Sequence, residues 1–223
     1  MSSRPPSRRR RRSCARRGSR SSPGGSRWIL GCGPGAHAMA LGRAGVEVHA
    51  IDGCLSLLEE LRGRRSGANI HVVHADLIRF REHFHGEADA VLCLGDTLTH
   101  LSSEDAVAGL LRDCAAVLRA GGVFVTTFRD YTGPGPVGPA RFIPVRSDAD
   151  RILTCCIEYE EKTVTVTDLI HERRGTSWDF RASSYTKLRL DPAWVVQILG
   201  EAGLSARRDA GPRGMVRITG KRA

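Results

Sequence analysis

Residues 28–35 read Trp28-Ile29-Leu30-Gly31-Cys32-Gly33-Pro34-Gly35, and this stretch decides the fold. The apolar run at 28–30 is typical of a short buried strand, and residues 36–44 have the pattern of a helix. A glycine-rich turn between a strand and a helix lets backbone N–H groups and the helix N-terminus approach a ligand closely. The three alternate glycines differ from the G-x-G-x-x-G spacing of dinucleotide-binding enzymes.

The pattern continues beyond this unit as an alternation of strands and helices. Strands are predicted at 46–51, 70–75, 88–94 and 123–128, and further helices at 55–62 and 103–118. Ser103, followed by Glu104 and Asp105, supplies a cap and two acids at the start of the last of these helices. Strands that alternate with helices over about 100 residues predict an α/β fold with a parallel sheet.

The periodicity then changes from helical to strictly alternating. Residues 141–145, 151–158, 163–171 and 176–190 alternate apolar and polar side chains without helices between them, which predicts an antiparallel β meander. Asp191-Pro192 opens one more helix, which runs to Gly203. Two short strands at 204–208 and 215–220 close the chain.

Acidic residues end the second and third predicted strands. Asp52 lies 19 residues after Gly33, where a carboxylate accepts both hydroxyls of a ribose, and Asp76 lies where a side chain reaches an adenine amino group. A nucleoside is therefore expected across the carboxyl ends of neighbouring strands. The alternatives are structural, because Asp52 is also suited to cap a helix and Asp76 to cap a turn.

These pieces resemble the class I S-adenosylmethionine-dependent methyltransferases. The matching segments are residues 30–35, 48–52, 74–77, 88–96 and 118–123, with the end of the chain also fitting. The resemblance implies a Rossmann-like, mostly parallel seven-stranded sheet of order 3-2-1-4-5-7-6 with an antiparallel last strand. It also implies an antiparallel β insert after strand 5, at about 139–190, acting as a lid over the site. The methyltransferase domain is then 28–223.

The same resemblance implies a set of site residues. The methionine and ribose of S-adenosylmethionine are expected at the glycine turn and at Asp52, the adenine near Asp76, and the methyl donor beside the end of the fourth strand. The cofactor-binding residues implied are Gly31, Cys32, Gly33, Gly35, Asp52, Gly53, Asp76, Leu77, Cys93, Leu94 and Gly95.

The end of the fourth strand also bears on the methyl acceptor. Residues 94–101 lack the Asn/Asp-Pro-Pro-Tyr signature of amino methyltransferases that act on DNA bases or glutamine, and resemble small-molecule N-methyltransferases of the glycine and sugar-amine type. The resemblance implies an enzyme that methylates a small molecule at nitrogen or oxygen. His100 is the candidate general base, or else a packed loop histidine. Thr97, Arg129, Asp130 and Tyr131 are the candidate acceptor-binding residues, and the last three are equally able to pair with one another.

Ile29 departs from the family pattern. Members usually carry an acid two residues before the first glycine, where it orients the amino-acid part of the cofactor. An alternative function is therefore a module that binds S-adenosylmethionine without transferring its methyl group.

The net charge of +10 lies in one segment. Residues 1–27 hold ten arginines and no acid, whereas residues 28–223 carry 24 basic and 24 acidic residues. The segment is predicted to be a disordered Arg/Ser/Pro-rich tail. Nucleic acid is expected as a partner only non-specifically, through this tail, and a nucleic-acid-associated role is a further alternative function.

Location and metal content are the remaining expectations. No apolar run is long enough to span a membrane. The seven cysteines lack C-x-x-C spacing and favour a reducing compartment, so the expected location is cytoplasmic, or organellar if the tail is a transit peptide. No metal site is predicted, because neither Cys nor acid completes a ligand set with His71 and His74 or with His83 and His85.

Overall fold

The first strand begins earlier than its apolar run. The computed structural model describes residues 26–223, and β1 spans Ser26–Leu30. The predicted tail of 1–27 is therefore too long by two residues, because the backbone of Arg27 pairs with Val48 and Ala90 and its guanidinium contacts Asp89 at 3.3 Å. The prediction for residues 1–25 lies outside the described residues.

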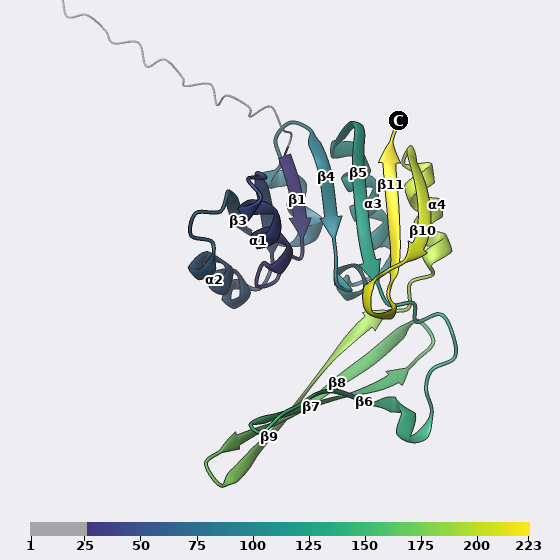
Figure 1. Cartoon of the computed structure of the whole chain (residues 1–223). Coiled ribbons are helices and arrows are strands. Elements are labelled where there is room, and N and C mark those ends of the chain that lie inside the picture. Colours follow the sequence, from purple (N-terminus) through teal and green to yellow (C-terminus); the bar gives the residue numbers. More distant parts are fainter. Residues whose placement is uncertain (1–25) are drawn as a thin grey trace, which may run out of the picture.

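Seven strands form one sheet with the predicted topology. The spatial order β10-β11-β5-β4-β1-β2-β3 is the expected order 3-2-1-4-5-7-6, and β11 is antiparallel to both of its neighbours (Figure 1). Besides β1, the strands are β2 (Val48–Asp52), β3 (Ile70–His74), β4 (Ala88–Cys93), β5 (Leu118–Phe128), β10 (Leu204–Ala210) and β11 (Val216–Arg222).

Helices cover the two faces of this sheet. α1 (Ala36–Arg43) and α2 (Leu55–Arg64) pack on one face, and α3 (Glu104–Val117) and α4 (Pro192–Glu201) pack on the other. Side chains alternate between the two faces along β1. Ile29 packs in the apolar cluster under α1 and α2, while Trp28 and Leu30 pack in the cluster under α3 and α4. Within residues 26–223, no helix combines the length and hydropathy that a membrane span requires.

Two local features differ from the sequence prediction. Strand β5 begins at Leu118, directly after α3, and not at Val123 as predicted. Leu118 already pairs with Ala88 on β4, and the register shifts between this pair and the pair of Val123 with Ala90. A 3₁₀ helix, η1 (Leu77–His83), follows β3, and the side chain of Asp76 caps it by accepting a hydrogen bond from Ile78 N. The helix lacks the 3.6-residue apolar period that would have predicted it.

The predicted meander forms a second sheet. A 3₁₀ helix, η3 (Gly138–Arg141), leads into four antiparallel strands, which are β6 (Phe142–Ser147), β7 (Arg151–Tyr159), β8 (Thr163–Arg174) and β9 (Ser177–Leu188). This insert joins the main sheet at the carboxyl end of β5 and extends away from it (Figure 1). Tyr131 fastens its base by packing against Ile157, Val164 and Val166.

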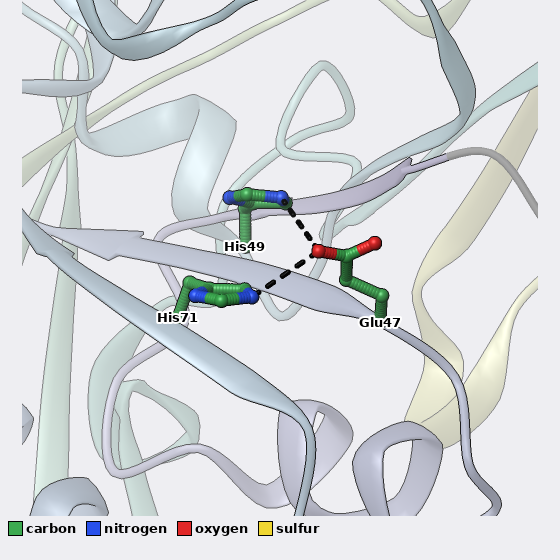
Figure 2. Close-up of side chains that lie close together, drawn as sticks. All are labelled: Glu47, His49 and His71. Atoms are coloured by element: carbon green, nitrogen blue, oxygen red, sulfur yellow. Dashed lines mark ion pairs between the residues drawn. The ribbon is translucent and has the colours of Figure 1, made fainter. Parts of the chain in front are cut away.

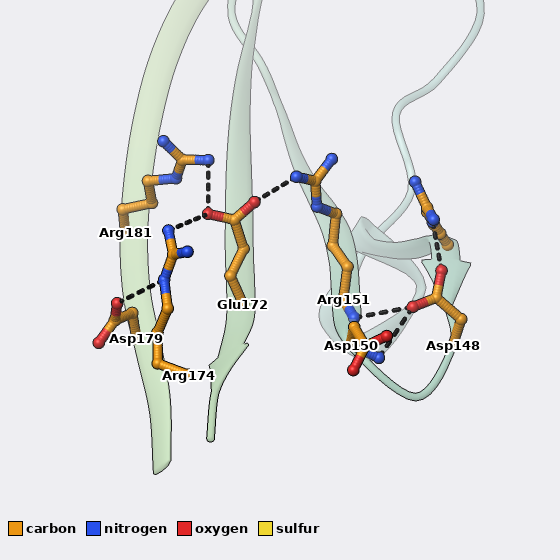
Figure 3. A network of polar contacts seen from close by, with 8 residues as sticks. Asp148, Asp150, Arg151, Glu172, Arg174, Asp179 and Arg181 are labelled. Carbon is orange, nitrogen blue, oxygen red and sulfur yellow. Dashed lines mark hydrogen bonds and ion pairs between the residues drawn. The ribbon is translucent and has the colours of Figure 1, made fainter. Parts of the chain in front are cut away.

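The far part of the insert is held by ionic contacts instead of an apolar core. Glu172 on β8 accepts hydrogen bonds from Arg151 on β7 and from Arg181 on β9, and Arg174 bridges to Asp179 (Figure 3). These contacts tie three neighbouring strands together across one face. Each such surface pair stabilises the fold by about 1 kcal/mol at most, so this end of the insert is expected to open before the main sheet does.

Gly35 shows why the turn after β1 requires glycine. Its φ of +84° is a left-handed conformation, and a Cβ at this position would lie 2.2 Å from Cδ1 of the fully buried Leu61 on α2. Gly45 has a similar φ of +81°, but no atom within 4 Å of the position of a Cβ. The two glycines therefore share a backbone constraint and differ in the space around them.

We expect Gly35→Ala to lower the free energy of unfolding by about 2–5 kcal/mol, since left-handed strain adds to overpacking against Leu61. Gly45→Ala is the matched control, with only the strain of about 1–2 kcal/mol. Urea unfolding of both variants measures the difference. Equal losses would show that the contact with α2 does not constrain Gly35.

Candidate active site

A cavity of about 1080 Å³ lies at the carboxyl ends of β1, β2, β3 and β4. Eleven of the sequence-predicted residues line it, which are Gly31, Cys32, Gly33, Asp52, Gly53, Asp76, Leu77, Leu94, Gly95, Thr97 and His100. It is also lined by residues that were not predicted, including His37, Leu57, His74 and Leu101. All of its lining residues lie between Gly31 and Leu101, so the expected lid contributes none of them.

The turn after β1 is held by the acid that ends β2. Asp52 accepts a hydrogen bond from Gly33 N through Oδ2 and one from Cys54 N through Oδ1, each at 2.8 Å. A carboxylate oxygen has two lone pairs, so both oxygens keep one for a further donor. Asp52 therefore shapes the glycine turn and still presents an acceptor pair to the cavity.

The other end of the same turn is closed by the loop after β4. A Cβ on Gly31, whose φ is +69°, would lie 2.2 Å from Cγ2 of Thr97. Thr97 itself is fixed, because its hydroxyl donates to Leu94 O at 2.8 Å. The turn after β1 and the loop after β4 thus meet at one point of the cavity wall.

The third strand contributes an acid and a histidine. Asp76 lines the cavity and also caps η1. The capping role that the sequence offered as an alternative is therefore present, and it does not prevent the residue from facing the cavity. His74 lies 3.1 Å from Gly53 O through Nε2, which links the ends of β2 and β3.

Several residues singled out in the sequence do not line the cavity. Gly35 directly precedes α1 and packs against Leu61, and Cys93 is fully buried on the α3 side of the sheet. Ile29 is buried on the opposite face, beneath α1 and α2. The acids that line the cavity within residues 26–223 are Asp52 and Asp76.

The two cysteines of the predicted site are poor nucleophiles. Burial, followed by the charge of Asp52, raises the pKa of Cys32 to about 12. Burial likewise raises the pKa of Cys93 to about 12. Both thiols therefore stay protonated at neutral pH, which makes them poor nucleophiles.

Asp96 joins three parts of the chain beneath the loop after β4. It is 2% exposed and has a left-handed φ of 72°. Its carboxylate accepts hydrogen bonds from Arg129 N at 2.6 Å, from the Arg129 guanidinium at 2.5 Å and from Lys187 Nζ at 2.9 Å. Burial alone would raise the pKa of Asp96, but the hydrogen bonds from Lys187 and Arg129 lower it below its ordinary value.

His100 ends the short 3₁₀ helix η2 (Thr97–His100), which follows Asp96. Its ring lies 5.4 Å from that of Tyr185 on β9, so the insert reaches the cavity wall here. Burial, followed by the charge of Lys187, lowers the pKa of His100 below 6.5, while Asp96 acts in the opposite direction. The imidazole is therefore neutral at pH 7 and able to accept a proton.

The residues after β5 were grouped as acceptor-binding candidates, and the structure gives them different surroundings. Arg129 is bound to Asp96. Asp130 accepts hydrogen bonds from Thr132 and from Arg208 on β10. Tyr131 is buried in the base of the insert. None of the three lines the cavity.

Lys187 and Tyr185 were not found by sequence reasoning. Both lie in an alternating strand whose pattern gives no sign of chemistry, and Lys187 is 91 residues from its partner Asp96. A lysine in a strand is normally exposed, so only the fold reveals that this one is buried and paired.

Comparisons with known proteins agree with this geometry. Residues 29–122 match the family model described as "Methyltransferase domain". The glycine/sarcosine N-methyltransferase of Aphanothece halophytica is 32% identical over 101 residues, which are 44% of this chain and 38% of that protein. The chain thus matches well under half the length of this curated relative.

Solved structures resemble about nine tenths of the chain. An S-adenosylmethionine-dependent methyltransferase from Clostridium acetobutylicum has a TM-score of 0.72 at 16% identity, covering 88% of this chain and 82% of its own. A SAM-bound amino pentose methyltransferase from Micromonospora echinaspora has a TM-score of 0.73 at 16% identity, covering 90% and 84%. Residues 29–122 therefore resemble a methyltransferase domain, and the chain has the fold of S-adenosylmethionine-dependent methyltransferases.

Proposed function

We propose that the chain is an S-adenosylmethionine-dependent methyltransferase that acts on an amine nitrogen of a small molecule. The observation that carries this proposal is one cavity lined by the glycine turn, by Asp52 and Asp76, and by a neutral His100. A relative that is 32% identical over 101 residues is named a glycine/sarcosine N-methyltransferase, which supports nitrogen as the acceptor atom.

The cavity fits this cofactor on three counts. A ligand can approach the backbone of Gly33 closely, because this residue has no side chain and no other atom lies within 4 Å of where a Cβ would be. Asp52 retains an acceptor on each oxygen for the ribose hydroxyls. Asp76 and Leu77 lie at the end of the next strand, where they would hold the adenine. Ile29 provides no acid, so backbone groups of the glycine turn would hold the amino-acid part.

The chain's own residues would act mainly by positioning. When bound, the cofactor supplies an electrophilic methyl group on a sulfonium. Holding an acceptor nitrogen in line with that group accounts for much of the acceleration. As the new N–C bond forms and the S–C bond breaks, the nitrogen becomes cationic, and His100 Nε2 or Nδ1 would take its proton.

The acceptor would enter between η2 and the base of the insert. Thr97 and His100 line the cavity on that side, and Tyr185 and Lys187 lie beside them on β9. Arg129 would help to position η2 through its contacts with Asp96. Asp130 and Tyr131 have structural partners that make them less suited to bind the acceptor. The insert would act as a lid through the contact between Tyr185 and His100 at its base.

The six described cysteines are free, which supports a reducing, cytoplasmic location.

The proposal is tested by titration calorimetry with S-adenosylmethionine, followed by mass spectrometry of glycine, sarcosine and amino-sugar acceptors. Saturable binding and a product heavier by one methyl group are expected. Binding without any methylated product would favour the inactive cofactor-binding alternative, and absence of binding would overturn both.

We expect Asp52→Asn to weaken cofactor binding by about 10- to 150-fold, since hydrogen bonds to a charged acceptor contribute roughly 1.5–3 kcal/mol. Calorimetry measures the effect. Asp113→Asn is the control, because Asp113 on α3 pairs with Arg81 on η1 and does not line the cavity. A change below threefold in Asp52→Asn would remove Asp52 from the binding site.

We expect His100→Gln to lower kcat by at least about 100-fold while cofactor affinity changes far less, because a general base acts only in the chemical step. Single-turnover kinetics with saturating cofactor separate the two effects. An unchanged kcat would assign His100 to packing against Tyr185.

A pH profile tests the coupling between the insert and His100. In the wild type, kcat should fall only below the lowered pKa of His100, and so below pH 6.5, because the protonated ring accepts no proton. In Lys187→Met the loss of a nearby positive charge raises that pKa, and the acid limb of the profile moves to higher pH. Lys187→Arg keeps the charge and should leave the limb in place. Identical profiles in all three proteins would contradict the coupling.

A further inference from the structure

One carboxylate and two imidazoles gather near the amino ends of β2 and β3, away from the cavity. Glu47 directly precedes β2, and the strand register places His49 opposite His71. Paired residues of neighbouring parallel strands share a face, and the next residue in this row is Trp28 on β1. The rings stack along the row, with centroids 4.6 Å apart between Trp28 and His49 and 4.8 Å apart between His49 and His71.

The three polar groups are close enough to share one ion. Oε1 of Glu47 lies 3.2 Å from Nε2 of His71 and 4.0 Å from Nε2 of His49, and the three potential ligand atoms all lie within 4.8 Å of one another (Figure 2). A tetrahedral Zn²⁺ with bonds of about 2.1 Å holds its ligand atoms roughly 3.4 Å apart. The cluster therefore needs to contract by little more than 1 Å.

The exposure of these side chains permits that contraction. His49 is the fixed member, since its ring packs against the buried indole of Trp28. The side chains of His71 and Glu47 are 53% and 32% exposed. The His71 ring can therefore turn out of the stack so that its nitrogen points toward the same place as that of His49, with solvent left free to supply a fourth ligand.

The charges also suit a cation. A histidine ligates metals in its neutral form. Glu47 adds one negative charge to the two imidazoles. None of these residues lines the cavity, and the proposed methyl transfer uses none of them.

We propose that Glu47, His49 and His71 form a binding site for a divalent transition-metal ion, with Zn²⁺ as the best match to a His₂Glu ligand set. Imidazole and carboxylate ligands suit Zn²⁺, and three protein ligands leave one position for water. The ion would tie β3, the edge strand of the main sheet, to β2. Asp52 lies three residues beyond His49, about 10 Å along the same strand, so the metal would act on the fold and not on the reaction.

The test uses Zn²⁺ itself with the full chain. Calorimetry and thermal unfolding are measured for the wild type, His71→Ala, Glu47→Gln and the control His171→Ala, whose histidine lies on β8 of the other sheet. One equivalent of Zn²⁺ should bind to the wild type and to the control and raise their Tm. Binding should weaken by roughly tenfold or more in the other two variants, with no rise in Tm.

Co²⁺ provides a second readout. A low-coordinate His/carboxylate site gives Co²⁺ a strong visible absorption that His71→Ala should abolish. Absence of saturable Zn²⁺ binding to the wild type would overturn the proposal. Equal affinity in His71→Ala would also overturn it, because the ion would then lie elsewhere. Cofactor binding without Zn²⁺ is measured in parallel, and it separates failure of this site from failure of the proposed function.

Discussion

The buried carboxylate of Asp96 holds the working parts of the molecule together. Its three hydrogen bonds join the loop after β4, the end of β5 and strand β9 of the insert. Removing one partner of a buried ion pair costs about 3–5 kcal/mol, whereas a surface pair contributes about 1 kcal/mol or less. The position of η2, and with it Thr97 and His100, therefore depends on a contact that lies behind the cavity wall.

This contact also explains how a meander inserted after β5 can act on the loop after β4. Lys187 reaches Asp96 from the insert, and its charge is one cause of the lowered pKa of His100. The far part of the insert is held by exposed ion pairs around Glu172. It can therefore open without disturbing the contact between Lys187 and Asp96 at the base of the insert. The insert is thus firmly attached at the site and loosely held at its free end.

Local sequence patterns were sufficient for the main sheet. The glycine turn, the strand-end acids and the alternation of strands with helices each act over few residues, and they predicted its strands and helices. The strand order and the antiparallel last strand, which the family resemblance implied, are also confirmed. The cavity lining was largely predictable as well, because Gly31, Gly33, Asp52 and Asp76 follow from the rule that ligands bind at the carboxyl ends of parallel strands.

Long-range pairings were not predictable in the same way. Lys187 is one alternating residue among many until the fold buries it. His71 was paired by its spacing with His74, but the register of β2 and β3 places it instead beside His49 and Glu47. The start of β1 at Ser26 was missed because Ser26 and Arg27 are polar, and their strand conformation comes from pairing with β2 and β4.

Three aspartates show how surroundings decide the role of one residue type. Asp52, Asp76 and Asp96 each follow or end a parallel strand, and each accepts at least one backbone N–H from the adjoining loops. Asp52 and Asp76 meet only N–H groups at their carboxylates, so they keep lone pairs directed to the cavity. Asp96 is surrounded by Lys187 and Arg129, which take up its capacity to accept hydrogen bonds. Strand-end position therefore makes an acid a candidate ligand, and nearby cations take up the acceptor capacity that a ligand would need.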